Sequence, residues 1–513
     1  MDLVLLHYHL NRGGVTRVIE NHLLALAAHG MDSSQLRVCI LYGGEALAWN
    51  EELTGKLPFE VELAPIPELG YDRGTPPSVE RITQGFADAL ATRSRESTVI
   101  HVHNHNLGKN AHFHRALNQL AVEGWRLLLQ IHDFAEDLRP QNYQHLVQHS
   151  PSVQELQASL YPQANQIHYA VLNRRDREIL TIAGFPTDRL HYLPNAAPNP
   201  ETVANRASAR ALLSQRCRVD PDRAYVLYPV RAIRRKNLGE ILVWAILADA
   251  EFGVTLAPLN PIERSAYERW ETQIEQLGLD IHLGVGDSGL TLQQNYAAAD
   301  AIVTTSVAEG FGLVFLEATL AQRRLVGRDL PGVTGDFRDA GMRFPGLYDS
   351  LSIPSDAVDL AEMKARYLAM CQDLRSAFQM PAYDSPQLTA TVDQMFDSPT
   401  IDFARCDRRT QHQFIERLNS DTELQQTVRA LNSHVRHIAI QTDDTNNNET
   451  ITTNREVIAR HYSLNVIGHR LNDIYDQLLA TPSDAPSQCG QIGRSILDQF
   501  VLPGELYPVR VES

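Results

Sequence analysis

Residues 309–317 read Glu309-Gly310-Phe311-Gly312-Leu313-Val314-Phe315-Leu316-Glu317. An apolar strand at Ala301–Val303 precedes this stretch, and the apolar residues after Gly312 predict a helix that begins near Leu313. Glycines at such a strand-to-helix turn let backbone amides face a ligand. Glu309 would lie in the turn and face a hydroxyl-rich group, and Glu317 would accept hydrogens from a ribose diol. The alternatives are an acid at a helix N-terminus for Glu309 and a surface salt bridge for Glu317.

Two cations follow another strand of the same predicted domain. Arg231 and Lys236 come after the strand Tyr225–Val230, within a basic run that ends at Asn237. The carboxyl ends of parallel strands meet at one edge of a sheet, where ligands bind. A guanidinium and an ammonium there could clamp a diphosphate and stabilise it as it leaves. A solvated basic loop is the alternative.

Short apolar strands alternate with amphipathic segments along the first two thirds of the chain. This order predicts parallel sheets covered by helices on both faces, and 513 residues are too many for a single core. We therefore expect an α/β protein with two Rossmann-like, doubly wound domains that face each other across a cleft. The first series of predicted strands is Leu3–Leu6, Arg37–Leu41, Thr98–Val102, Leu127–Ile131, Ile167–Leu172 and His191–Leu193. The second is Tyr225–Tyr228, Val254–Ala257, Asp280–Leu283, Ala301–Val303 and Leu325–Gly327.

Proline and asparagine mark the boundary between the two series, because Leu193–Pro200 is too rich in both to be regular structure. The expected domains are residues 1–198 and 199–460, followed by a helix and tail at 461–513 that cross back to the first domain. A polar helical insert at about 345–455 interrupts the second domain. Within it, Gln441–Thr450 is predicted to be a loop, and a helical pattern resumes over Arg455–Leu479.

Gly13 and Gly14 follow the first strand and precede a helix that we expect near Thr16. Paired glycines let backbone N–H groups approach a phosphate, and the helix N-terminus adds partial positive charge. A tight turn without a ligand is the alternative.

Taken in order, these motifs resemble the retaining glycosyltransferases of family 4, which have the two-domain GT-B fold. Arg231 and Lys236, followed by E-G-F-G-L-x-x-x-E at 309–317, carry most of the resemblance. Gly13-Gly14-Val15 resembles the first phosphate loop of that family, and Leu128–Asp133 resembles the strand that ends in its active-site histidine. Leu193-Pro194-Asn195 is similar to the linker entry, and Arg460–Tyr475 to the final crossing helix. The resemblance covers residues 3–340 and 455–480.

The resemblance implies a hexosyltransferase that needs no cofactor and no metal ion. The donor would be a nucleotide sugar linked to UDP, GDP or ADP. The anomeric configuration would be retained, with the leaving phosphate as the base. Arg231, Lys236 and the Gly13-Gly14 amides would hold the diphosphate, Glu317 the ribose, and Glu309 with the amides of Phe311, Gly312 and Leu313 the sugar. The resulting catalytic set is His132, Arg231, Lys236 and Glu309, in which His132 would contact the sugar beside the anomeric carbon.

Acceptor residues are expected where polar side chains follow the strand Thr98–Val102, namely His103, Asn104 and Lys109. Arg12, Lys109 and Arg139 could pair with an acceptor carboxylate or phosphate. The sequence departs from the family at 257–261, where Ala-Pro-Leu-Asn-Pro replaces a glycine-rich turn.

Two other functions remain open. His101, His103 and His105 alternate along one strand face and could ligate Zn²⁺, as in a metal-dependent hydrolase. The chain could also be a non-catalytic subunit that binds nucleotide sugars. Asp220-Pro221-Asp222 matches the metal-binding D-x-D pattern of some transferases, but it precedes a strand and fits a turn.

The overall composition argues against several kinds of partner. A formal net charge of −16 disfavours nucleic acid and anionic lipid, and no apolar run is long enough for a membrane helix. The five cysteines are scattered, which suits a reducing cytoplasm. We expect a cytoplasmic enzyme with a small soluble acceptor, and a homodimer fits these features as well as a monomer does.

Overall fold

The computed structural model describes residues 1–199, 204–433, 445–487 and 490–511. The chain forms two units. Unit 1 comprises Met1–Pro198, Ser376–Met380 and Ala459–Val501. Unit 2 comprises Asn199–Arg375, Pro381–Ile458 and Leu502–Ser513.

Unit 1 is built on a parallel sheet of seven strands in the order β3-β2-β1-β4-β5-β6-β7. Every residue of β1 and β4 is buried, as expected for central strands covered on both faces. The edge strand β3 was not predicted, because its half-exposed residues give no continuous apolar run. The strands are β1 (Asp2–His7), β2 (Arg37–Tyr42), β3 (Val61–Pro65), β4 (Thr98–His103), β5 (Arg126–Ile131), β6 (Ile167–Val171) and β7 (Leu190–Tyr192).

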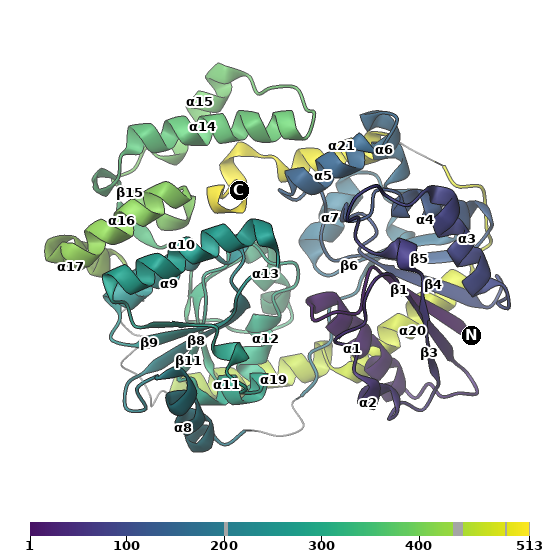
Figure 1. The fold of residues 1–513 in the computed structure, drawn as a ribbon, viewed down its shortest axis with the longest axis horizontal. Coiled ribbons are helices and arrows are strands. Elements are labelled where there is room, and N and C mark those ends of the chain that lie inside the picture. Colours follow the sequence, from purple (N-terminus) through teal and green to yellow (C-terminus); the bar gives the residue numbers. More distant parts are fainter. Residues whose placement is uncertain (200–203, 434–444, 488–489, 512–513) are drawn as a thin grey trace. The chain divides into compact units, whose positions relative to one another are not determined.

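Helices cover both faces of this sheet. On one face α1 (Gly14–Ala28) packs along α20 (Leu464–Ala480), and α3 (Val79–Leu90) and α4 (Phe113–Val122) lie on the other (Figure 1). Gly468 permits the close approach of α20 to α1, because a Cβ there would overlap the carbonyl oxygen of Ala25. The remaining α-helices are α2 (Glu51–Thr54), α5 (Pro140–Gln148), α6 (Val153–Ser159), α7 (Arg174–Ile182) and α21 (Gly490–Phe500).

Unit 2 holds a second parallel sheet, in the order β10-β9-β8-β11-β12-β13. Its strands are β8 (Tyr225–Arg231), β9 (Glu251–Leu256), β10 (Ile281–Leu283), β11 (Ala301–Thr304), β12 (Arg324–Arg328) and β13 (Leu347–Tyr348). Its helices include α8 (Arg206–Cys217), α9 (Leu238–Leu247), α10 (Pro261–Leu277), α11 (Leu292–Ala298), α12 (Leu313–Leu320) and α13 (Pro331–Asp339). The prediction of two Rossmann-like α/β domains is confirmed.

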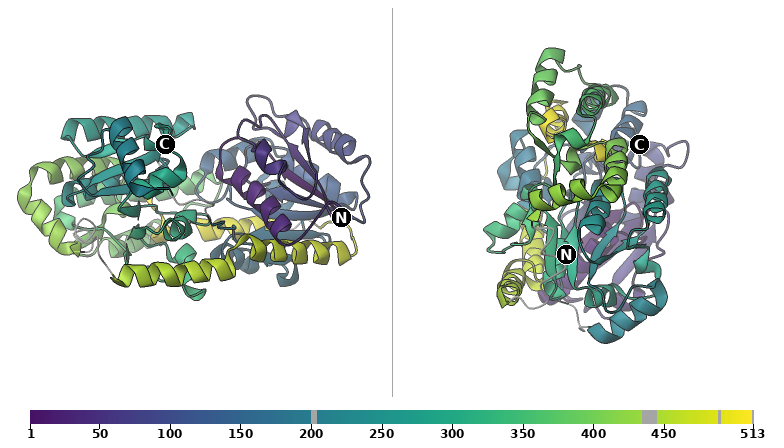
Figure 2. Two further views of the ribbon diagram at one scale, coloured as in Figure 1. Left: turned by 90° about the horizontal axis from the view of Figure 1, so that it is seen from below. Right: turned by 90° about the vertical axis from the view of Figure 1, so that its left-hand side faces the viewer.

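The predicted insert is mostly helical, but it also contains a small antiparallel pair, β14 (Ser352–Pro354) with β15 (Thr400–Asp402). Its helices are α14 (Leu360–Ala377), α15 (Ser385–Met395), α16 (Arg408–Ser420) and α17 (Thr422–Leu431). α16 packs against α9 and α10, outside the sheet of unit 2 (Figure 1). Figure 2 shows these green helices from two further directions.

The predicted loop at Gln441–Thr450 is wrong from Thr445 onward, because α19 (Thr445–His461) begins there, and residues 441–444 lie outside the described residues. The helical pattern predicted over Arg455–Leu479 is divided between α19 and α20 (Leu464–Ala480), and Ser463 stands in extended conformation at the N-cap position of α20. Of the helices in the described ranges, none has the length and apolar character needed to cross a membrane.

Candidate functional site

In unit 2 the structure brings Lys236 and Glu309 together as an ion pair. Lys236 ends the short helix η3 (Arg234–Lys236) after β8, and Glu309 lies in the turn after β11, which is the neighbour of β8 in the sheet. The side chains of Lys236 and Glu309 are only 12% and 8% exposed. Arg231, the last residue of β8, donates from Nη1 to the carbonyl of Ala257 at 2.8 Å. The cations and the acid therefore share the carboxyl edge of one sheet, as their sequence positions predicted.

Glu309 is held in its charged form. Burial opposes ionisation, but the charges of Lys236 and Arg235 outweigh it and lower the pKa of this carboxyl below its usual value. Ser306 also donates a hydrogen bond to Glu309 Oε1 at 2.7 Å. The side chain is thus a fixed hydrogen-bond acceptor at the strand end.

The rest of the glycine-rich turn leads into α12. Gly312 precedes the helix with φ of 78°, a conformation that favours glycine, and a Cβ there would press on Phe315 and Val333. Phe311 is buried, and Leu313 opens the helix. Glu317 accepts a hydrogen bond from Tyr296 Oη at 2.9 Å, so its observed partner is a hydroxyl.

Gly13 and Gly14 stand at the start of α1 in unit 1. Gly13 has an extended backbone, and both residues are exposed. A Cβ on Gly14 would meet no atom within 4 Å among the described residues. The turn therefore leaves room beside the helix N-terminus, and its contact with a phosphate stays a prediction.

A second group of candidate residues ends two neighbouring strands of unit 1, β4 and β5. His103 Nδ1 lies 2.9 Å from His132 Nε2, and both rings are buried. Asn104 has φ of 63°, and its Oδ1 accepts the backbone N–H groups of His132 and Asp133 at 2.9 Å each. His103 and Asn104 thus fix His132 in place. Lys109 is half-buried, with its ammonium 5.7 Å from the centroid of the Tyr71 ring.

The metal triad of the alternative hydrolase interpretation, His101, His103 and His105, is not assembled. His105 turns away and its Nε2 lies 3.1 Å from the carbonyl of Leu160. Instead, His22 of α1 joins His101 and His103, with ring nitrogens within 4.8 Å of one another. The rings of His101 and His103 stack at 4.4 Å and 22°, so their lone pairs lie in nearly parallel planes and do not converge on one ion.

Both nitrogens of His101 have partners, Tyr475 Oη at 2.8 Å and Gln130 Oε1 at 2.9 Å. Burial lowers the pKa of His101 to about 3 and that of His132 to about 4, so both are neutral near pH 7. The cluster is a stack of neutral rings. The hydrolase alternative was based on a metal site formed by His101, His103 and His105, and the structure does not bring them together in such a site.

Sequence reasoning missed the residues that support the predicted ones. His22 lies on a helix, far from the histidine-rich strand, and Tyr296 and Ser306 carry no motif. Arg328, Glu240 and Asp402 form a buried ion network that reaches the Lys236 turn. Only Asn237, directly after Lys236, gave a local signal, because asparagine tolerates the left-handed conformation that it adopts.

No family model matches the chain. Mannosylglucosyl-3-phosphoglycerate synthase of Petrotoga mobilis is 27% identical to it over 422 residues, which cover 79% of this chain and 78% of the relative.

Solved structures similar to the chain include sucrose-phosphate synthase from Thermosynechococcus elongatus, with a TM-score of 0.54 and 14% identity over 93% of this chain and 99% of that one. HepE of Anabaena in complex with UDP-glucose gives a TM-score of 0.51 and 13% identity over 92% and 98% of the two chains. Fold and sheet order define the chain as a protein of the GT-B fold.

Proposed function

We propose that the chain is a glycosyltransferase that moves a hexose from a nucleotide-sugar donor to a small hydroxyl acceptor. The observation that carries the proposal is the Lys236–Glu309 pair at the carboxyl ends of β8 and β11. A cation for a diphosphate and a carboxylate for sugar hydroxyls stand side by side, which is the arrangement that a nucleotide sugar requires.

In this proposal unit 2 holds the donor. Arg231 and Lys236 bind the diphosphate and stabilise the charge that develops as the bond from the anomeric carbon to the phosphate oxygen breaks. Glu309 and the amides of Phe311, Gly312 and Leu313 hold the sugar, and Glu317 holds the ribose. The backbone amides of Gly13 and Gly14 are proposed to bind a phosphate.

Transfer retains the anomeric configuration. The acceptor oxygen bonds to the anomeric carbon on the face that the phosphate leaves, and a phosphate oxygen takes the acceptor proton. The two cations neutralise the leaving group, so the reaction needs no divalent ion. Full, reversible loss of activity in EDTA would overturn that part of the proposal, and an inverted product anomer in proton NMR would overturn retention.

The acceptor is a small anionic compound that binds unit 1. The name of the Petrotoga relative describes a product with a phosphoglycerate group. Lys109, Arg12 and Arg139 carry positive charge that would attract such a group, and Arg139 also pairs with Asp133 at 2.5 Å. We propose Lys109, which follows the end of β4, as a contact of the acceptor anion, and a cytoplasmic location fits such a metabolite.

The test is a panel of UDP-, GDP- and ADP-sugars incubated with glucosyl-3-phosphoglycerate, glycerate or glucose as acceptor. Transfer to an anionic acceptor is expected, and Lys109→Met should raise the KM for that acceptor and leave the KM for the donor unchanged. Binding of nucleotide sugars without transfer or hydrolysis would favour the non-catalytic alternative. Liposome binding with activity only on lipid acceptors would contradict the small acceptor.

A further inference from the structure

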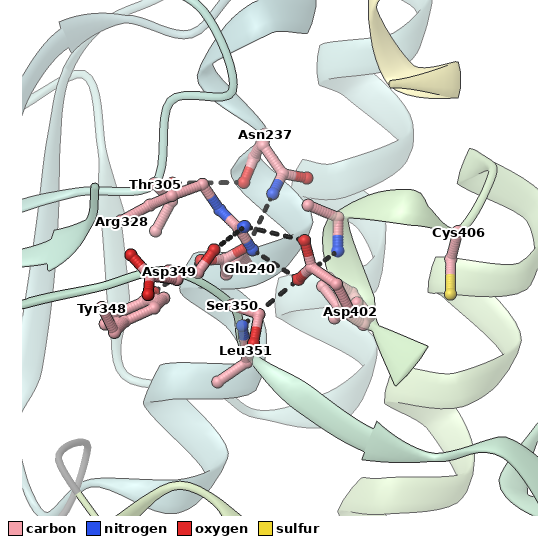
Figure 3. Close-up of polar contacts among 12 residues, drawn as sticks. Asn237, Glu240, Thr305, Arg328, Tyr348, Asp349, Ser350, Leu351, Asp402 and Cys406 are labelled. Atoms are coloured by element: carbon pink, nitrogen blue, oxygen red, sulfur yellow. Dashed lines mark hydrogen bonds and ion pairs between the residues drawn. The ribbon is translucent and has the colours of Figure 1, made fainter. Parts of the chain in front are cut away.

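Arg328, the last residue of β12, is almost fully buried between two carboxylates of unit 2. Its Nη2 donates to Glu240 Oε2 at 2.6 Å and to Asp402 Oδ1 at 2.8 Å, and its Nη1 donates to Asp402 Oδ2 at 2.8 Å (Figure 3). The Arg328 side chain is 1% exposed and that of Glu240 is 0% exposed. Asp402 belongs to the insert and Glu240 to α9, so the arginine ties the insert to the helix that follows Lys236.

The same network continues into the turn that carries Lys236. Glu240 accepts a hydrogen bond from Asn237 Nδ2 at 2.8 Å. Asn237 has φ of 48°, and the chain turns there from η3 into α9. The carbonyl of Lys236 accepts from Tyr228 Oη and from Thr305 Oγ1, each at 2.9 Å. The turn is therefore held from several sides by buried polar contacts.

A second side chain of the insert reaches the same asparagine. Gln411 of α16 is fully buried, and its Nε2 donates to Asn237 Oδ1 at 3.1 Å. Gln411 also packs on Gly239, where a Cβ would press on it and on Trp270. Asn237 is thus fixed at both ends of its amide, by Glu240 on one side and by Gln411 on the other.

We propose that the insert is part of the donor phosphate site: Asp402 and Gln411 are positioning residues that set the place of Lys236 through Glu240 and Asn237. This inference rests on the proposed role of Lys236 in holding a diphosphate. It assigns to residues 400–411 a function that neither the motifs nor the comparisons give them.

The buried network around Arg328 is costly in free energy. Burying an arginine and its two carboxylates removes strong hydration, and apolar side chains of the same volume would stabilise the protein as well or better. Ion pairs and amide hydrogen bonds fix the relative orientation of the groups that they join, because each bond forms only within a narrow range of distances and angles. An ammonium displaced by about 1 Å from a leaving phosphate can cost a rate factor of about 10².

The test compares Asp402→Asn and Gln411→Met with a matched control, Asn432→Ala. Asn432 is also a buried polar residue of the insert, and it bonds the backbone of Ser352, which pairs with Asp402 between β14 and β15. The control therefore perturbs the same part of the insert without changing Asp402, Gln411, Glu240 or Asn237. UDP, GDP and ADP serve as probes, and calorimetry measures the dissociation constant of the one that binds. We expect both test variants to weaken binding about 10-fold or more and to lower kcat, with the acceptor KM unchanged. The control should lose thermal stability only.

A double-mutant cycle separates positioning from general destabilisation. In a Lys236→Ala background, Gln411→Met should leave diphosphate affinity unchanged, because its effect passes through the missing ammonium. Equal weakening in both backgrounds, or unchanged affinity in both single variants, would overturn the inference.

Amide hydrogen exchange provides a readout that does not depend on glycosyl transfer. Exchange over residues 233–238 should rise in Gln411→Met and stay at the wild-type level in Asn432→Ala. If no nucleoside diphosphate binds the wild-type protein, the proposed function fails, and the exchange result still decides whether the insert holds the turn. Unchanged exchange in Gln411→Met would show that it does not.

Discussion

His103 Nδ1 and His132 Nε2 lie 2.9 Å apart, so one imidazole donates to the other. His103 Nε2 is buried and has no partner among the described residues. An unpaired buried N–H is rarer than an unpaired acceptor, which places the single proton of His103 on Nδ1, where it is donated to His132. His132 then carries its own proton on Nδ1. It presents a hydrogen-bond donor, which agrees with a mechanism in which phosphate is the base.

Replacing His103 should therefore disturb His132. We expect His103→Leu to lower kcat by about 10²-fold, because the His132 ring, for which we propose a contact with the donor sugar, loses its orientation. Nitrogen NMR of labelled wild-type protein should show His132 protonated at Nδ1. His105→Gln is the control, since His105 is equally buried but bonds Leu160. Equal activity loss in both variants would contradict a specific role for His103.

The histidine stack should make the protein sensitive to acid. Burial lowers the pKa of His22 well below 6.5, so the unfolded chain binds a proton there that the folded chain does not. The stability contributed by neutral His22 is complete above pH 6.5 and declines below it by about 1.4 kcal/mol per pH unit. In His22→Phe this decline is absent, so the stability of the variant should rise relative to that of the wild-type protein as the pH falls below 6.5.

Urea denaturation of both proteins across this range measures the difference. Burial raises the pKa values of Glu136 and Asp176 to about 7, so these two acids increase the stability of the folded protein as the pH falls. Both residues are present in the wild-type protein and in the variant, so their contributions cancel in the difference between the two proteins. Parallel pH profiles would show that His22 is not a buried neutral base.

The variant Glu309→Gln distinguishes the proposed contact of Glu309 with the sugar from that of Lys236 with the diphosphate. Removing the carboxylate leaves Lys236 without its buried counter-ion, at a cost of about 1–3 kcal/mol in stability. A nucleoside diphosphate should restore that loss and bind at least as tightly as to wild type, whereas transfer should fall strongly. Thermal shifts with and without UDP, GDP or ADP test this. Weaker diphosphate binding in the variant would place Glu309 at the phosphate.

Gly468→Ala tests the packing of unit 1. The new methyl group would overlap the carbonyl oxygen of Ala25, so α20 and α1 must separate, and we expect a loss of about 1–3 kcal/mol. Gly335→Ala is the control, because that position of α13 is open, and it should gain about 0.5–1 kcal/mol. Equal stability of the two variants in urea would contradict the close helix contact.

The sequence was sufficient for the two sheets and for the Lys236–Glu309 edge, because apolar strands and glycine turns are local signals. The edge strands β3 and β13 and the pair β14–β15 were not predicted, since short or half-exposed strands carry little apolar pattern. The roles of His22 and Asp402 were not predicted for another reason. Their roles depend on side chains that lie far away in sequence, and only the fold brings these together.

The proposed role of Lys236 in stabilising the leaving diphosphate is tested by comparing sugar transfer by the wild-type protein and by Lys236→Ala under the same conditions. Each protein is incubated with UDP-, GDP- or ADP-glucose and the corresponding mannose donors, with an anionic acceptor, and release of nucleoside diphosphate and glycoside is followed. We expect wild-type turnover with one donor class and a loss of about 10²–10³-fold in the variant, the range for removing one group that stabilises developing negative charge. Near-normal turnover by Lys236→Ala would contradict the account.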